Sequence, residues 1–178
     1  GQIMPPAEFI LAAETYQRMG TVDRWVIQRV LEWMAEHRDA LDDFGGFSIN
    51  VSGHSINEET FPDFVLEQFV RTQAPTGKVC FEITETAAIT NLENAREFMN
   101  RMKIIGCRFS LDDFGTGVSS YSYLRNLPVD FVKIDGVFVR DVASDDDDYA
   151  VVRSINEIGH YLGKQTIAEC VESAEVLA

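Results

Sequence analysis

Short strand-like segments alternate with helix-like segments along this chain, and that alternation restricts the fold more than any other feature. Five runs rich in β-branched and aromatic residues favour strands, at 47–51, 79–84, 108–111, 130–134 and 165–168. Segments with helical periodicity lie between and before them, at 6–15, 22–37, 58–72, 92–105, 119–127 and 149–162. Strands that alternate with helices over short connections are typical of parallel β/α units, so we expect an α/β fold with five parallel strands.

Polar side chains follow each strand-like run at its carboxyl end. They are Asn50 and Ser52, Glu82 and Glu85, Asp112 and Asp113, Lys133 and Asp135, and Glu169 and Glu172. A single Asp after a strand is ordinarily a turn residue or a helix N-cap. Five strands with the same pattern predict a shared site, because the carboxyl ends of parallel strands meet on one face, as in TIM barrels.

The residue types at these positions indicate a divalent metal. Asn50, Glu82, Asp112 and Asp113 offer only oxygen ligands, which suit Mg²⁺, Mn²⁺ or Ca²⁺ better than zinc. Adjacent aspartates suit two ions, with Asp112 as a bridge, in a site for phosphodiester hydrolysis. The remaining cation and carboxylate keep two interpretations each. Lys133 either assists the reaction or forms a structural ion pair with Asp135 or Asp113. Glu169 is either a general base or a further metal ligand.

Composition narrows the class of partner. The 178 residues carry a net charge of -14, which argues against binding to a nucleic-acid polymer. A phosphorylated substrate still fits if divalent cations lie between the two negative partners. No apolar run reaches the length of a membrane span, and the three cysteines form no CxxC pair. We therefore expect reduced thiols and a cytoplasmic location.

Five motifs in this order resemble the EAL domain family. They are SINVS (48–52), FEITE (81–85), LDDFGTGVSSYSYL (111–124), LPVDFVKID (127–135) and IAECVES (167–173), and MPPAEFILAAE (4–14) resembles a helix of that family. The resemblance covers nearly all of the chain and implies a TIM (β/α)8-type barrel. The chain begins on a helix and stops just after a strand, so we expect one partial EAL domain over 1–178, with the first and last strands of the barrel missing.

The resemblance also implies an activity and residue roles. Members of the family hydrolyse cyclic di-GMP to linear pGpG with Mg²⁺ or Mn²⁺. Asn50, Glu82, Asp112 and Asp113 would be metal ligands, Lys133 would contact the catalytic water, and Glu169 would be the general base or lie beside the second ion. The remaining positions would support the site. Glu85 would hold the loop at 114–120, Gly115 and Gly117 would make that loop pliable, and Asp135 and Glu172 would assist.

Two departures and three alternatives accompany this interpretation. The signature glutamate of the family is absent, so we expect residues 1–178 alone to be inactive although the parent domain is active, and Cys170 stands where the family has glycine. The main alternative is a receptor that binds cyclic di-GMP without hydrolysing it. A kinase, suggested by Asp113-Phe114-Gly115, lacks the other kinase motifs, and another Mg²⁺-dependent barrel is disfavoured by the motifs alone. We expect a parent fused to sensory or GGDEF domains, with membrane anchoring through such domains and homodimerisation as further possibilities.

Overall fold

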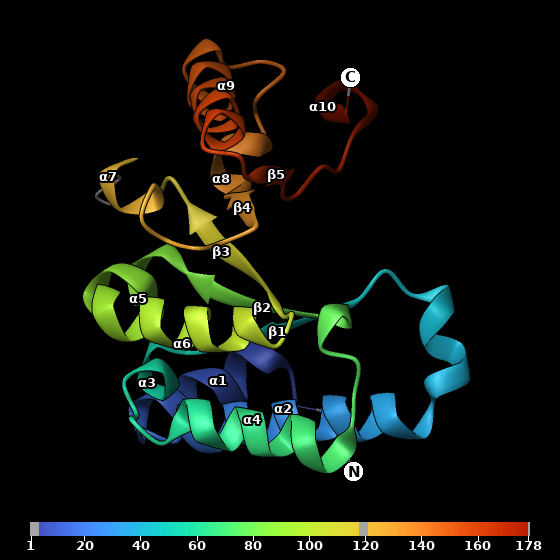
Figure 1. Ribbon diagram of the computed structural model, residues 1–178. Coiled ribbons are helices and arrows are strands. Elements are labelled where there is room, and N and C mark those ends of the chain that lie inside the picture. The colour runs from blue at the N-terminus through green and yellow to red at the C-terminus, as the bar shows by residue number, and fades with distance from the viewer. Residues whose placement is uncertain (1–3, 118–120, 178) are drawn as a thin grey trace.

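The five expected strands form one parallel sheet. The computed structural model describes residues 4–117 and 121–177, and its sheet has the order β1-β2-β3-β4-β5 (Figure 1). The strands are β1 (Phe47–Asn50), β2 (Val79–Thr84), β3 (Arg108–Phe114), β4 (Phe131–Ile134) and β5 (Gln165–Ala168). Every neighbouring pair is parallel, as the alternation predicts, so all five carboxyl ends lie at one end of the sheet.

The long helices lie where periodicity places them, and of the short helices described here only α7 (Tyr121–Leu124) coincides with an expected helix. The long helices are α1 (Pro6–Thr15), α2 (Met19–Glu36), α4 (Phe61–Thr72), α6 (Leu92–Ile104) and α9 (Asp146–Tyr161). The short helices are α3 (Gly53–Ile56), α5 (Glu85–Thr90), α7 (Tyr121–Leu124), α8 (Gly136–Val139), α10 (Ala174–Leu177) and the 3₁₀ turns η1 (Arg38–Asp43) and η2 (Thr76–Lys78). In the described ranges, no helix is both long and apolar enough to cross a membrane. The helix expected at 119–127 is only α7, and residues 119 and 120 of that expectation lie outside the described part of the chain.

A proline marks where helix α4 begins, and a capping side chain marks where helix α9 begins. Helix α4 starts at Phe61 rather than at 58, and Pro62 occupies its first turn, where no intrahelical N–H partner is needed. Helix α9 starts within a run of four aspartates (145–148), because the side chain of Asp145 accepts hydrogen bonds from the backbone N–H groups of Asp147 and Asp148. The acidic run is therefore a helix N-terminus, where negative charge is favourable.

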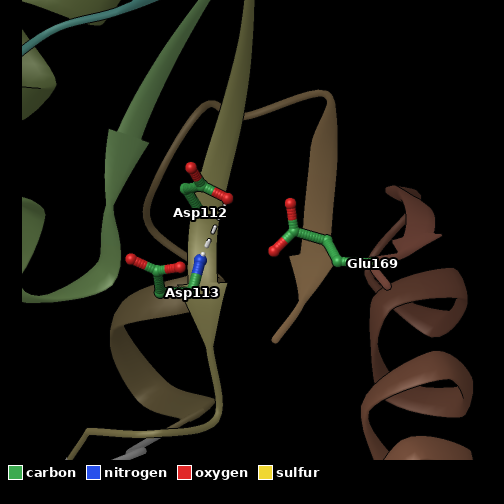
Figure 2. Close-up of side chains that lie close together, drawn as sticks. All are labelled: Asp112, Asp113 and Glu169. Carbon is green, nitrogen blue, oxygen red and sulfur yellow. Dashed lines mark hydrogen bonds between the residues drawn. The ribbon is translucent and has the colours of Figure 1, made fainter. Parts of the chain in front are cut away.

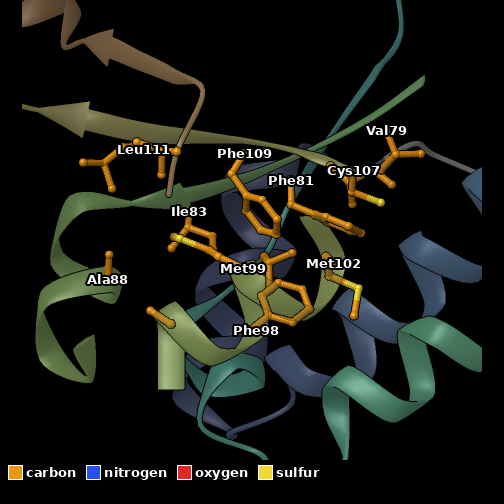
Figure 3. Close-up of a cluster of buried hydrophobic side chains, with 14 of the residues drawn as sticks. Val79, Phe81, Ile83, Ala88, Phe98, Met99, Met102, Cys107, Phe109 and Leu111 are labelled. Carbon is orange, nitrogen blue, oxygen red and sulfur yellow. The ribbon is translucent and has the colours of Figure 1, made fainter. Parts of the chain in front are cut away.

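One face of the sheet packs on the helices and forms the core (Figure 3). Phe81 of β2, Phe109 of β3 and Phe98 of α6 lie with their ring centroids 5.6 Å apart in every pairing, and all three are fully buried. Residues that alternate with these along the strands point to the other face. Strand period thus divides β2 and β3 into an apolar helix-facing set and a polar set.

The face of the sheet that carries the polar set lines an open pocket of about 190 Å³. Glu82, Arg108, Ser110 and Phe131 are among its lining residues. The Ser110 hydroxyl and the Arg108 Nε are buried there, and neither has a hydrogen-bond partner among the described residues. This is the face that a TIM barrel turns toward its axis, where layers of side chains fill the interior.

Strand β3 contains an irregularity that bears directly on the site. Leu111 pairs with Val132 and Phe114 pairs with Ile134, so β3 uses one more residue than β4 over the same interval. Asp113 has a φ of 54°, in the left-handed region. The strand was expected to end at 111, but it continues past this bulge to Phe114. A bulge re-aims the side chains next to it, and here it lies at Asp112 and Asp113.

Candidate functional site

Lys133 forms the centre of an ion cluster at the carboxyl ends of the strands. Its ammonium lies 2.7 Å from an oxygen of Asp112, 2.7 Å from one of Glu169 and 3.1 Å from one of Glu82. Four strands contribute these groups, since Glu169 directly follows β5. The side chains are only 12–25% exposed, so the charges interact in a poorly solvated environment. The predicted partners of a structural pair, Asp113 and Asp135, are not those that Lys133 contacts.

Three carboxylates of the cluster lie close enough to share a cation. Asp112, Asp113 and Glu169 each place an oxygen within 4.8 Å of the others. Figure 2 shows the two aspartates at the end of β3 and Glu169 facing them from the segment after β5. The Asp112 carboxylate also accepts a hydrogen bond of 3.2 Å from the backbone N–H of Asp113. The bulge thus lets two consecutive residues contribute to one cluster.

The pKa values of Asp113 and Lys133 are both raised, which disfavours the charged form of Asp113 and favours the charged form of Lys133. Burial raises the pKa of Asp113, and the charges of Asp112, Asp135 and Glu169 raise it further. Burial would lower the pKa of Lys133, but hydrogen bonds to Asp112 and Glu169 outweigh that effect and hold it above the ordinary value. One ammonium is therefore surrounded by more carboxylate charge than it can neutralise.

Strand register places Asn50 beside this cluster. Asn50 pairs with Glu82 across β1 and β2, so the two side chains project on the same face of the sheet. Asn50 is exposed, whereas Glu82 is nearly buried and bonded to Lys133. All four residues predicted as metal ligands thus lie at one end of the sheet.

Glu85 is buried beneath the loop that follows β3. It is 1% exposed, accepts a hydrogen bond of 3.0 Å from the backbone N–H of Gly115, and is bonded to the hydroxyl of Tyr123. Gly115 has a φ of 106°, which favours glycine, and a Cβ there would also lie 3.0 Å from the ring of Phe138, while a Cβ on Gly117 would lie 3.3 Å from the Glu85 carboxylate. Gly115 is therefore favoured by both conformation and space, and Gly117 by space alone.

The two remaining predicted positions lie at the margin. Asp135 caps α8 through a hydrogen bond of 2.7 Å from the backbone N–H of Val137, and its charge acts on Asp113. Glu172 lies exposed in the segment after β5, where its charge acts on Arg140. Glu172 is thus placed near the site but outside the Lys133 cluster.

Sequence reasoning missed two residues that hold the site in place. Asp23 of α2 is 4% exposed, and one of its oxygens accepts hydrogen bonds from the N–H and hydroxyl of Ser52 and from the hydroxyl of Ser55. It thereby fixes the turn that follows Asn50. Tyr123 of α7 donates a hydrogen bond from its hydroxyl to the Glu85 carboxylate. Asp23 gave no local signal, because an acid within a helix ordinarily faces solvent, but Tyr123 lies in the same motif as the loop.

The donor set fits a hard divalent cation. The clustered ligands are all carboxylate oxygens, and Lys133 neutralises only one of the charges on Glu82, Asp112, Asp113 and Glu169. Burial raises the pKa of Asp113 most, and the neighbouring carboxylate charges raise it further, as expected where negative charge is in excess. The arrangement can therefore bind a cation and, through it, an anionic phosphodiester.

Comparison with known proteins points to a single family. The sequence profile of the EAL domain matches residues 1–178. The chain is 42% identical over 177 residues to cyclic di-GMP phosphodiesterase PdeB of Shewanella oneidensis, covering 99% of this chain and 21% of that protein. It is 34% identical to cyclic di-GMP phosphodiesterase PdeF of Escherichia coli, covering 98% and 23%. The chain thus spans about a fifth of the length of these relatives.

Solved structures give the same result for the fold. The complex of the PaMucR phosphodiesterase with c-di-GMP superposes with a TM-score of 0.89 at 28% identity, over 97% of this chain and 70% of that one. The EAL domain of FimX gives a TM-score of 0.89 at 28% identity, over 99% and 71%. The expectation of a TIM-barrel-like α/β fold, present here as a fragment of the barrel, is confirmed. This chain belongs to the EAL domain family.

Proposed function

We propose that the EAL domain represented by this chain hydrolyses cyclic di-GMP to linear pGpG. The observation that carries the proposal is the cluster at the carboxyl ends of the strands, where Lys133 lies within 3.1 Å of three carboxylates and Asp113 adjoins them. This is the end of the sheet where parallel β/α barrels carry their active sites. The names of PdeB and PdeF and the c-di-GMP complex of PaMucR support the choice of substrate.

Each residue of the cluster takes a role from its chemistry. Asn50, Glu82, Asp112 and Asp113 would hold Mg²⁺ or Mn²⁺, and we propose two ions because adjacent aspartates offer enough oxygens to serve both. The ions, when bound, offset the phosphate charge and activate water for attack. Glu169 accepts a proton from the attacking water as general base. Lys133 keeps its proton, because its pKa is raised, and so orients that water or offsets charge on the phosphate.

Residues outside the cluster keep it in position. Glu85 holds the backbone N–H of Gly115 and thereby fixes the loop that directly follows the two aspartates. Asp135 caps α8 and leaves its charge near Asp113. Glu172 and Gly117 complete the supporting set that we propose.

The catalytic unit is the complete EAL domain. The chain corresponds to 70–71% of the solved EAL chains and about a fifth of the whole relatives. We therefore expect full activity from the longer protein and little from residues 1–178 alone. In that protein we propose further sensory or GGDEF domains, a cytoplasmic location for the EAL domain, and assembly as a homodimer.

The test is hydrolysis of cyclic di-GMP by the full-length protein, with pGpG measured by chromatography. We expect turnover with Mg²⁺ or Mn²⁺ that stops in EDTA. Glu169→Gln and Asp112→Asn should each lower the rate by about 100-fold or more. Glu157→Gln is the matched control, because it makes the same chemical change as Glu169→Gln at an exposed ion pair on α9.

Three outcomes would contradict the proposal. Turnover by Glu169→Gln at the rate of the control would contradict the role of Glu169 as general base. Turnover in EDTA would contradict the dependence on a divalent metal. Tight binding of cyclic di-GMP by the unmodified protein without any pGpG would favour a receptor.

A further inference from the structure

Residues 136 and 170 lie against each other directly behind the candidate general base. Cys170 follows Glu169, and Gly136 is the first residue of α8, which begins one residue after the N-cap Asp135. The backbone N–H of Glu169 donates to the carbonyl of Ile134, which ties the two segments together. Any change in the separation of residues 136 and 170 therefore acts next to Glu169.

The space at this contact is filled by the side chain of Cys170. A Cβ built on Gly136 would lie 2.3 Å from the Cys170 sulfur and 2.8 Å from its Cβ. Rotation of the thiol can relieve the first contact but not the second, because the Cβ moves only with the backbone. Gly136 is buried and its φ is not left-handed. It is therefore required here for space and not for conformation.

The conformation at residue 170 makes the opposite demand. Cys170 has a φ of 54°, a left-handed conformation that glycine adopts freely and a residue with a side chain adopts at a cost. The thiol lies along α8, since Nη2 of Arg140 at the far end of that helix donates to its sulfur over 3.6 Å. Residue 170 thus tolerates glycine well, and residue 136 tolerates a side chain only if residue 170 has none.

We propose that Gly136 and Cys170 form a coupled pair that positions Glu169 against Lys133. With Cys170 present, a side chain at position 136 pushes the segment after β5 away from α8. Glu169 moves with that segment, and its contact of 2.7 Å with Lys133 and its place near Asp112 and Asp113 are lost. With glycine at position 170 the same side chain fits. The activity readout rests on the proposed function, but the steric coupling does not.

The experiment is a double-mutant cycle in the full-length protein with Gly136→Ala, Cys170→Gly and the two combined. In EDTA, Gly136→Ala should lower the unfolding midpoint by about 3–10 °C when Cys170 is present and by less than about 2 °C when residue 170 is glycine. With Mn²⁺, it should weaken metal binding in calorimetry and lower the rate of pGpG formation about 10- to 100-fold with Cys170 present, and about twofold or less in the glycine background. The control is Gly77→Ala, where an added Cβ meets nothing within 4 Å.

Each result decides one part of the proposal. Equal effects of Gly136→Ala in the two backgrounds would overturn the coupling. A lower midpoint with unchanged Mn²⁺ affinity and turnover would overturn the positioning of Glu169. If Gly136→Ala fails to fold, recovery of a folded protein by the added Cys170→Gly still supports the coupling, and its absence refutes it. If the effect of Gly136→Ala on the unfolding midpoint depends on residue 170 but neither the unmodified protein nor any variant forms pGpG, the proposed function fails and the coupling stands.

Discussion

Replacing Lys133 by methionine tests whether the cluster is as charged as its geometry implies. Methionine keeps most of the side-chain length and removes the ammonium, so Glu82, Asp112 and Glu169 lose a partner at 3.1, 2.7 and 2.7 Å. Removing one member of a buried ion pair costs about 3–5 kcal/mol, because it leaves uncompensated charge. These side chains retain 12–25% exposure, so we take the lower end, about 3 kcal/mol. For a domain of this size that corresponds to a fall of roughly 6–12 °C in the unfolding midpoint.

The assay is thermal unfolding followed by circular dichroism in EDTA near pH 7. Arg153→Met is the control, because it removes a cation from an ion pair of 2.8 Å whose side chains are 63% and 62% exposed. Exposed pairs contribute little to stability, so the control should shift the midpoint by less than about 4 °C. Adding Mn²⁺ should recover part of the loss in Lys133→Met, since a divalent cation offsets the same carboxylates. Equal midpoints for the two variants in EDTA would refute this electrostatic account.

The difference in unfolding midpoint between the unmodified protein and Lys133→Met should depend on pH in one direction. The pKa of Lys133 is raised above its ordinary value of 10.5 in the folded protein. Its stabilising contribution is therefore complete below pH 10.5 and is lost as the pH rises through the higher folded value. The gap between the unmodified protein and Lys133→Met should stay constant from pH 7 to 10 and narrow above that. A gap that narrows between pH 7 and 10 would mean that Lys133 is not held in its charged form.

Two further predictions concern other parts of the structure. Burial raises the pKa of Cys80 to about 11 and that of Cys107 to about 12, so at pH 8 a thiol reagent should titrate only the half-buried Cys170 rapidly in the folded protein; fast reaction of all three thiols would contradict the burial of the other two. Tyr123→Phe removes a hydrogen bond to the buried Glu85 and should lower the free energy of unfolding by about 2 kcal/mol in urea titration, whereas an unchanged midpoint would show that Glu85 does not depend on that hydroxyl.

The spacing of apolar residues along the sequence predicted the parts of the fold that depend on burial. Strands β2, β3 and β4 have an apolar set that is buried in the core, and the long amphipathic helices repeat at helical spacing, so both types of element were recognised. The short helices α3, α5 and α8 were missed because each is defined by a capping side chain, from Ser52, Thr84 and Asp135, and not by a repeating apolar stripe.

The site was predictable as a set of residues but not as a set of contacts. Parallel strands bring their carboxyl ends together, and this is why Glu82, Asp112, Lys133 and Glu169 were expected at one end of the sheet. Which carboxylates Lys133 contacts depends on register and on the bulge in β3. The sequence suggested Asp113 and Asp135 as its structural partners because they are near in the motifs, whereas the sheet presents Glu82, Asp112 and Glu169.

The extra residue in β3 also reverses which positions of that strand point outward. Before the bulge, the odd-numbered Phe109 and Leu111 pack on the helices; after it, the even-numbered Phe114 does so and is fully buried. Gly115 consequently leaves the strand with its N–H directed to the Glu85 carboxylate. Deleting either aspartate would return the strand to simple alternation and leave Phe114 in the core, with one carboxylate fewer at the site. The bulge therefore adds a second acidic side chain at the mouth of the site without disturbing the packing beneath it.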